Sequence, residues 1–438
     1  YDAEFAGEHI HLKVIADKAV EMEFGTGALG VTPAHSAIDW EMAQRHNLPL
    51  KPVINEYAKM LVGNEAIKGK KTSEAREAVV AWLKEQELLE KEEAIDQNVA
   101  TAERTGGIVE PLPKLQWFIG VNKEFKRDGR TVTLKTLMQE AVSKGGINIL
   151  PDRFEKIYYN WIENLRDWCI SRQIWYGHRI PVWYKNAGTP KEEVYCGIDT
   201  PKGDGWVQDE DTLDTWFSSG LWTFSTLGWP DEKAFAKHRM YHPTHVLETA
   251  YDIIFFWVAR MILMSTYLLG EIPFKTVYLH GLVRDGQGRK ISKSLGNNID
   301  PLDMIAKYGA DAVRMSLIVG TGPGNDSRIS EDKIKGYRNF ANKLWNITRF
   351  ILTSTEGVQM NEDFKDYTEA DKKLAQERDA LITEVTKEMN EYKFYLVAEK
   401  LYHYAWHTLA DTILEESKTV FASGDSNAIA SRQQFLLN

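Results

Sequence analysis

The feature that most limits how this chain can fold is a strand, a loop and a helix in direct succession around residue 290. Residues 274–283 are apolar and rich in β-branched and aromatic side chains, which predicts a buried strand. Further along, Asp300 and Pro301 predict a helix start, because aspartate caps exposed backbone N–H groups and proline fits the first helical turn. This pattern favours an α/β domain with a parallel sheet.

The loop between these elements carries two lysines three positions apart, flanked by hydroxyl side chains and glycines. These residues are Lys290, Ser292, Lys293, Ser294, Gly286, Gly288 and Gly296. Paired ammonium groups on such a loop suit the neutralisation of a triphosphate during displacement at phosphorus. A solvated basic turn explains the same residue types equally well, so the loop by itself leaves both interpretations open.

The sequence around the lysines resembles a known signature. The run Lys290-Ile291-Ser292-Lys293-Ser294 is similar to the KMSKS motif of class I aminoacyl-tRNA synthetases, with isoleucine in place of the usual methionine. Isoleucine keeps an apolar side chain of similar volume. The residues that follow, 295–303, also match the family's continuation.

Length, charge and cysteine content narrow the class of protein. The chain has 438 residues, 43% of them hydrophobic, which is enough for about three domains. Its formal net charge of −10 argues against binding to DNA by bulk electrostatics, so we expect no DNA partner, and any RNA contact needs a local basic patch. Cys169 and Cys196 form no CxxC pair, which favours a reducing, cytoplasmic setting without a disulfide framework.

The longest apolar run, residues 253–269, is the segment of this sequence that could form a membrane span. It carries Arg260 at its middle and Ser265 and Thr266 near its end. Charged and hydroxyl side chains at these depths predict a buried helix instead, and no membrane partner.

Four further segments resemble the valyl branch of the synthetase family. They are residues 167–183, 211–222, 226–230 and 251–257. His178 and Arg179, which follow Gly177, are typically absent from isoleucyl enzymes. An isoleucyl-type relative is the alternative.

The resemblance implies an α/β fold with a Rossmann-type class I catalytic domain, of which this chain holds the C-terminal half. Residues 1–112 would be the C-terminal part of an α/β editing domain, 113–329 the second half of the catalytic domain, and 330–438 a truncated helical anticodon-binding domain.

The same resemblance implies a site for ATP, with Mg²⁺ as its counter-ion, and a site for valine. His280 and Gly281 would pass beneath the adenine and Asp252 would face the ribose. Lys290 and Lys293, with Ser292 and Ser294, would hold the phosphates. The valine side chain would be enclosed by Trp216, Ile253 and Trp257. Ile253 and Trp257 are four apart, which predicts one helical face.

A small apolar pocket rejects threonine only about a hundredfold. An editing domain that hydrolyses the mischarged product would make up for this weak discrimination. Residues 24–35 resemble the core of that domain, in which an aspartate matching Asp39 holds the ammonium group of the mischarged amino acid. Relatives usually carry an aspartate where this chain has Ser36, and valyl enzymes often carry a lysine at Gly30. Helix capping by Asp39 is the alternative, and the sequence leaves editing activity open.

No metal site is expected in this chain. Residues 101–106 fall where many valyl enzymes carry a zinc-binding CxxC knuckle, and both cysteines are absent here. We therefore predict no zinc.

Apolar periodicity predicts the remaining elements. Strands are expected at 13–16 and 19–24, and helices at 38–46, 73–93 and in three stretches beyond residue 330. The glycine-rich run 320–326 contains Pro323 and no GxxxxGK[ST] pattern, which predicts a turn instead of a phosphate-binding P-loop.

The resemblance thus implies a valine–tRNA ligase, whose partners are valine, ATP and tRNA(Val) and which edits mischarged threonine. The chain lacks the family's first catalytic motif, of the His-x-Gly-His type. We therefore expect that this chain alone does not aminoacylate. A catalytically incomplete tRNA-binding or structural fragment is the alternative function.

Overall fold

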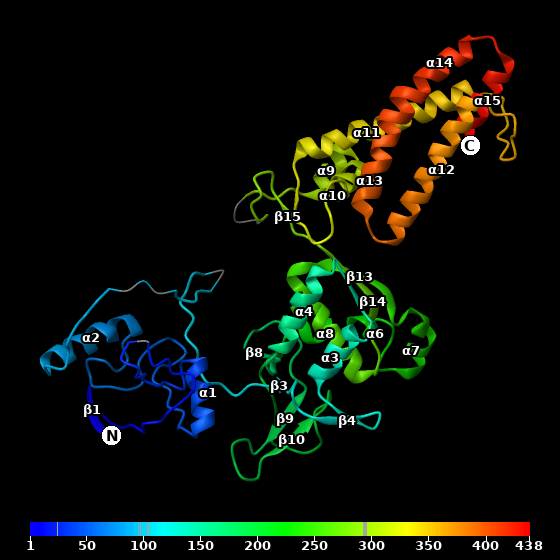
Figure 1. Ribbon diagram of the computed structural model, residues 1–438. Helices are drawn as coiled ribbons and strands as arrows, with labels where there is room; N and C mark the ends of the chain where they lie inside the picture. The colour runs from blue at the N-terminus through cyan, green and yellow to red at the C-terminus, as the bar shows by residue number, and fades with distance from the viewer. Residues whose placement is uncertain (24, 95, 97, 103–104, 292–295) are drawn as a thin grey trace. The chain divides into compact units, whose positions relative to one another are not determined.

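A computed structural model describes all residues except 24, 95, 97, 103–104 and 292–295 (Figure 1). The chain divides into two compact units, Tyr1–Gln116 and Trp117–Asn438. Each unit has its own hydrophobic clusters and is described by itself.

The first unit combines a short β-hairpin with two helices. Strand β1 (Asp2–Phe5) pairs antiparallel with β2 (Glu8–His11). Helix α1 (Ala37–His46) follows, and its N-cap Ser36 accepts a hydrogen bond from the Asp39 N–H. Helix α2 (Thr72–Glu85) ends earlier than the periodicity predicted, and its Ala75 packs with Ala6 and Ile67.

The strands predicted at 13–16 and 19–24 are wrong; of the latter range, Phe24 lies outside the described residues. Residues 13–16 are irregular and 18–23 are mostly turn. The cause is Asp17, whose nearly buried carboxylate is held by Arg45 and His46 at the end of α1 while its carbonyl accepts the Val20 N–H. Alternation alone does not make a strand where no neighbouring strand satisfies the backbone.

The second unit is built on a parallel sheet. Strand β14 (Phe274–His280) lies between β13 (Thr244–Ala250) and β6 (Asn148–Leu150), and all three run parallel. The residue pairs Ala250–His280 and Leu150–Tyr278 place the three carboxyl ends at one edge. The sheet confirms the α/β class and a strand that starts at Phe274, but this strand ends at His280 and not at Val283 as predicted.

The connection from β13 to β14 is the predicted buried helical run. It consists of a 3₁₀ turn η2 (Tyr251–Ile253), a π-helical turn η3 (Ile254–Val258) and helix α8 (Ala259–Leu268). Residues 259–266 are all buried. The stretch 251–268 is long and apolar enough to cross a membrane, yet 56% of it is buried inside the fold, as in the core helix of a globular domain.

Further elements surround this sheet. The helices are α3 (Leu134–Ser143), α4 (Arg153–Glu163), α5 (Thr215–Gly220), α6 (Trp222–Ser225), α7 (Glu232–His238) and the 3₁₀ turn η1 (Arg239–Tyr241). The short strands are β3 (Phe118–Ile119), β4 (Phe125–Arg127), β5 (Arg130–Val132), β7 (Trp168–Cys169), β8 (Ser171–Arg172), β9 (Val182–Lys185), β10 (Glu193–Cys196), β11 (Trp206–Gln208) and β12 (Thr212–Leu213). Helices α3 and α5 pack on α8, which covers the sheet's core face.

After the sheet the chain turns helical. Strand β15 (Val283–Arg284) pairs with β16 (Ser327–Arg328), and between them lie α9 (Pro301–Tyr308) and α10 (Ala310–Ile318). Asp300 caps α9 by accepting the Leu302 N–H at 2.8 Å, as predicted. Residues 320–326 form a turn-rich loop, also as predicted.

The helices predicted beyond residue 330 are confirmed (Figure 1). They are α11 (Glu331–Ser354), α12 (Glu369–Asn390), α13 (Phe394–His403), the π-helical η5 (Tyr404–Ile413), α14 (Leu414–Ala422) and α15 (Ser426–Leu437). A buried ion pair between Asp371 and Arg432 joins α12 to α15, and Arg432 also donates to Ser417 of α14.

Candidate functional site

The parallel sheet brings several of the predicted ATP-site residues to its carboxyl edge. Asp252 follows β13 and is exposed, while His280 is the last residue of β14. The His280 ring is half-buried: Nδ1 lies 2.7 Å from the Gly281 carbonyl oxygen and Nε2 3.1 Å from the Glu248 carboxylate. Ligands of open α/β sheets bind outside this edge.

Gly281 has a structural reason to be glycine. A Cβ at this position would lie 2.0 Å from the Asn325 carbonyl oxygen and 2.5 Å from the Asp326 nitrogen. The end of β14 therefore touches the backbone of the 320–326 loop directly. This contact, and not the nearness of a ligand, is what the structure requires of Gly281.

A carboxylate network fixes the same edge. Asp326 accepts hydrogen bonds from the Tyr251 hydroxyl at 2.9 Å and from the Leu282 N–H at 2.8 Å, and it pairs with Arg284. These hydrogen bonds hold the pKa of Asp326 below its ordinary value, against the opposing effect of burial. The network joins the start of η2, the end of β14 and β15.

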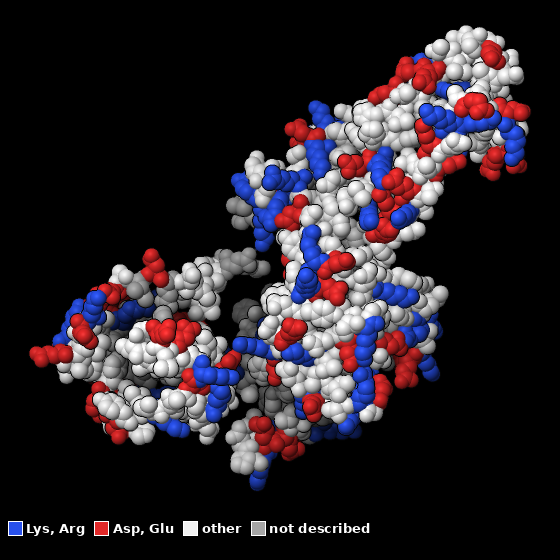
Figure 2. All heavy atoms as spheres, in the orientation of Figure 1, with Lys and Arg blue, Asp and Glu red and all other residues white. Residues whose placement is uncertain are grey.

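The predicted phosphate-binding residues are only partly within the described chain. Lys290 is exposed, and its backbone bridges to that of Arg284. Lys293, Ser292 and Ser294 lie outside the described residues. Lys and Arg side chains gather on the face that carries β15 (Figure 2).

The base of this loop is organised by an acidic residue that sequence reasoning missed. Asp285 is only 5% exposed. One oxygen accepts the N–H groups of Gln287 and Arg289, and the other accepts the Arg289 guanidinium and the Asn297 amide. These hydrogen bonds, the one from Asn297 above all, lower the pKa of Asp285 to about 2. Its place before a Gly-x-Gly turn was the available signal.

Two of the three predicted valine-pocket residues, Trp216 and Trp257, lie on α5 and η3, two elements that pack against each other. Trp216 of α5 stacks on Phe256 of η3 with ring centroids 5.8 Å apart. The Trp257 indole N–H donates to the Ser219 carbonyl oxygen at 3.0 Å. The third residue, Ile253, ends the 3₁₀ turn, so the spacing rule for a regular α-helix does not describe its relation to Trp257.

The buried guanidinium of Arg260 packs next to this group of aromatic residues. The Arg260 guanidinium is sandwiched between Trp168 and Phe255, 4.1 and 4.7 Å from the ring centroids. Burial lowers its pKa to about 10, and the charge of Asp214 opposes this shift. Asp214 in turn accepts the Trp168 indole N–H and caps α5, so the cation and the carboxylate together anchor this wall.

In the first unit, the predicted editing residue faces inward. Asp39 is 7% exposed, and its Oδ2 accepts the Thr32 N–H at 2.8 Å and the Thr32 hydroxyl at 3.1 Å. The helix cap is Ser36, not Asp39. The carboxylate thus holds the 25–35 loop onto α1 through Thr32.

His35 fastens the same loop at a second point. The Val53 N–H donates to Nε2 at 2.9 Å, so Nε2 must be the unprotonated nitrogen. Nδ1 therefore carries the hydrogen and donates to the Pro111 carbonyl oxygen at 3.0 Å. Both ring nitrogens are engaged, which leaves His35 no free nitrogen for general-base catalysis.

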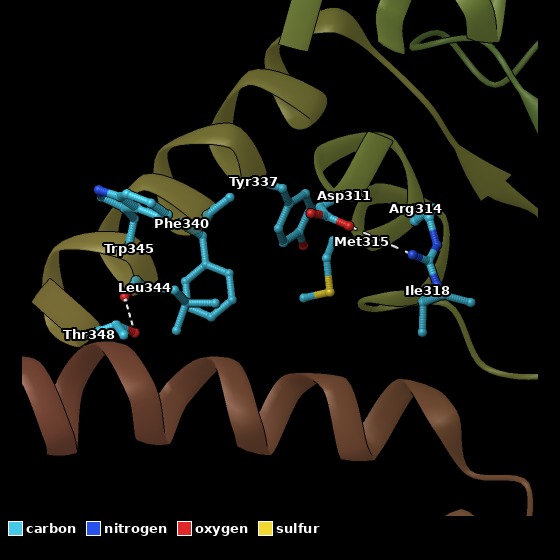
Figure 3. A pocket seen from close by; sticks show the side chains of 10 residues that line it. Asp311, Arg314, Met315, Ile318, Tyr337, Phe340, Leu344, Trp345 and Thr348 are labelled. Atoms are coloured by element: carbon cyan, nitrogen blue, oxygen red, sulfur yellow. Dashed lines mark hydrogen bonds and ion pairs between the residues drawn. The ribbon is translucent and has the colours of Figure 1, made fainter. Parts of the chain in front are cut away.

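A cavity of about 570 Å³ lies away from the sheet edge, between α10 and α11 (Figure 3). Its wall is mostly apolar, including Met315, Phe340 and Leu344, with Asp311 and Arg314 at one side. Within the described part of the chain, no group of three or more His, Cys, Asp or Glu side chains could hold a metal ion.

Two family models match this chain, and the first of them spans parts of both units. The model of the class I tRNA synthetases (I, L, M and V) matches residues 38–202 and 199–330. The model of the anticodon-binding domain of tRNA ligases matches residues 371–438.

Curated relatives agree with this match. The valine–tRNA ligase of Clostridium acetobutylicum is 44% identical over 424 residues, which are 95% of this chain and 46% of the relative. That of Bacillus licheniformis is 44% identical over 427 residues, with the same coverage. The chain therefore spans about half the length of the relatives it matches.

Solved structures share the fold. The methionyl-tRNA synthetase of Mycobacterium tuberculosis, solved in complex with methionyl-adenylate, aligns with a TM-score of 0.52 and 19% identity over 72% of this chain and 61% of that one. The apo form of the same synthetase gives 0.52 and 17% identity over 78% and 61%. Because the family model covers residues 38–330, more than half of the chain, the chain belongs to the class I tRNA synthetases of the isoleucyl, leucyl, methionyl and valyl group.

Proposed function

We propose that the protein carrying this chain is a valine–tRNA ligase, which activates valine with ATP to valyl-adenylate and transfers the valyl group to tRNA(Val). The observation that carries this proposal is the 44% identity to valine–tRNA ligases across 95% of the chain. A soluble translation enzyme of this kind works in the cytoplasm, and its partners are valine, ATP and tRNA.

In this proposal ATP binds at the carboxyl edge of the β13–β14–β6 sheet. Asp252 and His280 line that edge and are available to the ribose and the adenine. Magnesium enters with the phosphates as part of the MgATP substrate. Lys290, Lys293, Ser292 and Ser294 neutralise and orient the phosphates while the valine carboxylate displaces pyrophosphate.

Valine selection is assigned to residues of α5 and of the consecutive turns η2 and η3. Trp216 and Trp257 are stiff aromatic walls, and Ile253 is a branched aliphatic one. The Trp257–Ser219 hydrogen bond and the stack of Trp216 on Phe256 limit how far these walls can move. A rigid apolar slot excludes isoleucine by overpacking, but it rejects threonine only about a hundredfold.

Editing of threonine is the second activity that we propose for the protein, with Asp39 as the anchor of the ammonium group. Its Oδ2 is engaged by Thr32, so the ligand would bind the other oxygen, Oδ1. Ser36, which stands where relatives usually carry an aspartate, is occupied as the cap of α1.

Amino-acid-dependent exchange of pyrophosphate into ATP tests this function. The assay uses the natural protein that contains residues 1–438, with whatever chain flanks them. We expect valine to support exchange and threonine to have a kcat/KM about a hundredfold lower. Stronger exchange with isoleucine would make the protein an isoleucyl enzyme, and no exchange with any amino acid would refute adenylate formation.

A further inference from the structure

The loop that carries Lys290 is tied at its base to one buried carboxylate. Asp285 Oδ1 accepts the Gln287 N–H at 3.0 Å and the Arg289 N–H at 2.8 Å. Its Oδ2 accepts Arg289 Nε at 2.8 Å and Asn297 Nδ2 at 3.0 Å. The same Asn297 amide also donates to the Lys290 carbonyl oxygen at 3.0 Å.

These contacts reach both sides of the residues 292–295. Arg289 and Lys290 precede them and Asn297 follows them, yet all three connect directly or through one amide to Asp285. The turn is closed further by the backbone, since Gly288 N–H donates to the Asp285 carbonyl and Asp285 N–H to that of Arg289. A turn that is held by four hydrogen bonds to one carboxylate is ordered more firmly than a turn that is held by a single hydrogen bond.

The base of the loop is in turn joined to the sheet edge. Arg284, the neighbour of Asp285, pairs with Asp326, which accepts from the Tyr251 hydroxyl and the Leu282 N–H. Tyr251 directly precedes Asp252. A short series of hydrogen bonds therefore links the proposed nucleotide edge to the segment that positions Lys290.

We propose that Asp285 is a positioning residue: it fixes both ends of the lysine loop and so sets where Lys290 stands relative to the ATP phosphates. This role rests on the proposed activation of valine by ATP. Asp285 touches neither substrate in this assignment. Its effect is transmitted through Arg289 and Asn297, whose side chains it binds.

A first experiment needs no activity. Amide hydrogen exchange is measured on residues 285–291 of the chain itself and of Asp285→Ala, Asn297→Ala and Asp303→Ala. Asp303 is an exposed aspartate in the first turn of α9 and serves as the matched control. We expect exchange at Gln287 and Arg289 to rise at least about tenfold in Asp285→Ala, less in Asn297→Ala, and not in Asp303→Ala.

A second experiment measures valine-dependent pyrophosphate exchange in the natural protein with the same substitutions. Misplaced phosphate ligands lower kcat, so we expect Asp285→Ala to lose about a hundredfold in kcat with the KM for valine within about threefold. Asn297→Ala, which removes one donor, should lose less. A merely structural role would change both constants or neither.

The two readouts separate the possible failures. Unchanged hydrogen exchange in Asp285→Ala would overturn the fixing of the loop, and faster exchange with normal kcat would overturn its role in catalysis. If the unsubstituted protein lacks pyrophosphate exchange with every amino acid, the proposed function fails, and the role of Asp285 in phosphate positioning fails with it.

Discussion

At the scale of single residues, buried side chains can make the stability of this protein depend on pH, and His242 is one such side chain. Its side chain lies between the rings of Phe224 and Phe235, and Nε2 is 3.5 Å from the Ser265 hydroxyl. Burial lowers the pKa of His242 below its ordinary value of 6.5, and the charge of Arg239 lowers it further. The folded protein therefore binds a proton on this imidazole less tightly than the unfolded chain does.

This environment makes stability depend on pH. Near pH 6.5 the unfolded chain begins to protonate His242 while the folded chain does not, so stability falls as the pH drops below that value, down to the lower folded pKa. Urea unfolding at pH 7.5 and 5.5 should show a loss of stability at the lower pH, and this loss should be smaller in His242→Gln. His245→Gln, at an exposed position, should keep it. Equal losses in all three proteins would contradict the assignment.

Asp39 and Asp285 show why residue type alone does not define a role. Both are buried aspartates near a loop and a helix or strand end. Asp39 binds the loop residue Thr32, whereas Asp285 gathers donors from positions up to twelve residues away. Which donors reach a carboxylate depends on how the folded chain brings distant residues near it. A single sequence does not predict this.

At the scale of elements, two glycines differ in the space around the position of a Cβ, and substituting each by alanine tests the packing of its element. Gly281 leaves no room for a Cβ beside Asn325, whereas Gly336 lies inside α11 with nothing within 4 Å of its would-be Cβ. Alanine at Gly281 must push two backbones apart. Alanine at Gly336 only improves the helix propensity.

The expected changes in the free energy of unfolding have opposite signs. Gly281→Ala should lower it by about 1–3 kcal/mol through overpacking. Gly336→Ala should raise it by about 0.5–1 kcal/mol. Urea titrations followed by circular dichroism measure both. A neutral Gly281→Ala would mean that β14 and the 320–326 loop are not in contact.

Elements with a strong period were predictable from the sequence, and elements that depend on distant partners were not. The helices α1, α11 and α12, the strand β14 and the cap at Asp300 follow from periodicity and local chemistry. The strands expected at 13–16 and 19–24 were wrong because Asp17 is drawn to Arg45 and His46 on α1.

The candidate site divides in the same way. The lysine loop, Trp216 and the edge residues Asp252 and His280 could be selected from their motifs. The packing of Gly281 on Asn325 and the Asp285–Asn297 bond could not, since both require the folded loops. For Ile253 and Trp257, the sequence predicted one regular helical face, but a 3₁₀ turn and a π turn meet there.

At the scale of the whole molecule, the chain combines a unit of mixed structure with a unit that carries the sheet and the helices. The family models match residues on both sides of Gln116, so both units belong to the synthetase family's chain. A net charge of −10 means that any nucleic acid bound by this chain must contact local basic surface, and Lys and Arg side chains gather near β15 (Figure 2).

The most direct test of the whole proposal is the identity of the amino acid that the natural protein esterifies to tRNA. The purified protein is incubated with ATP, Mg²⁺, unfractionated tRNA and each amino acid in turn, and the acid-precipitable label is counted. We predict that valine is attached and that the other amino acids, isoleucine and threonine included, stay at background. Stable attachment of a different amino acid, or of none, would contradict the assignment of this chain to a valine–tRNA ligase.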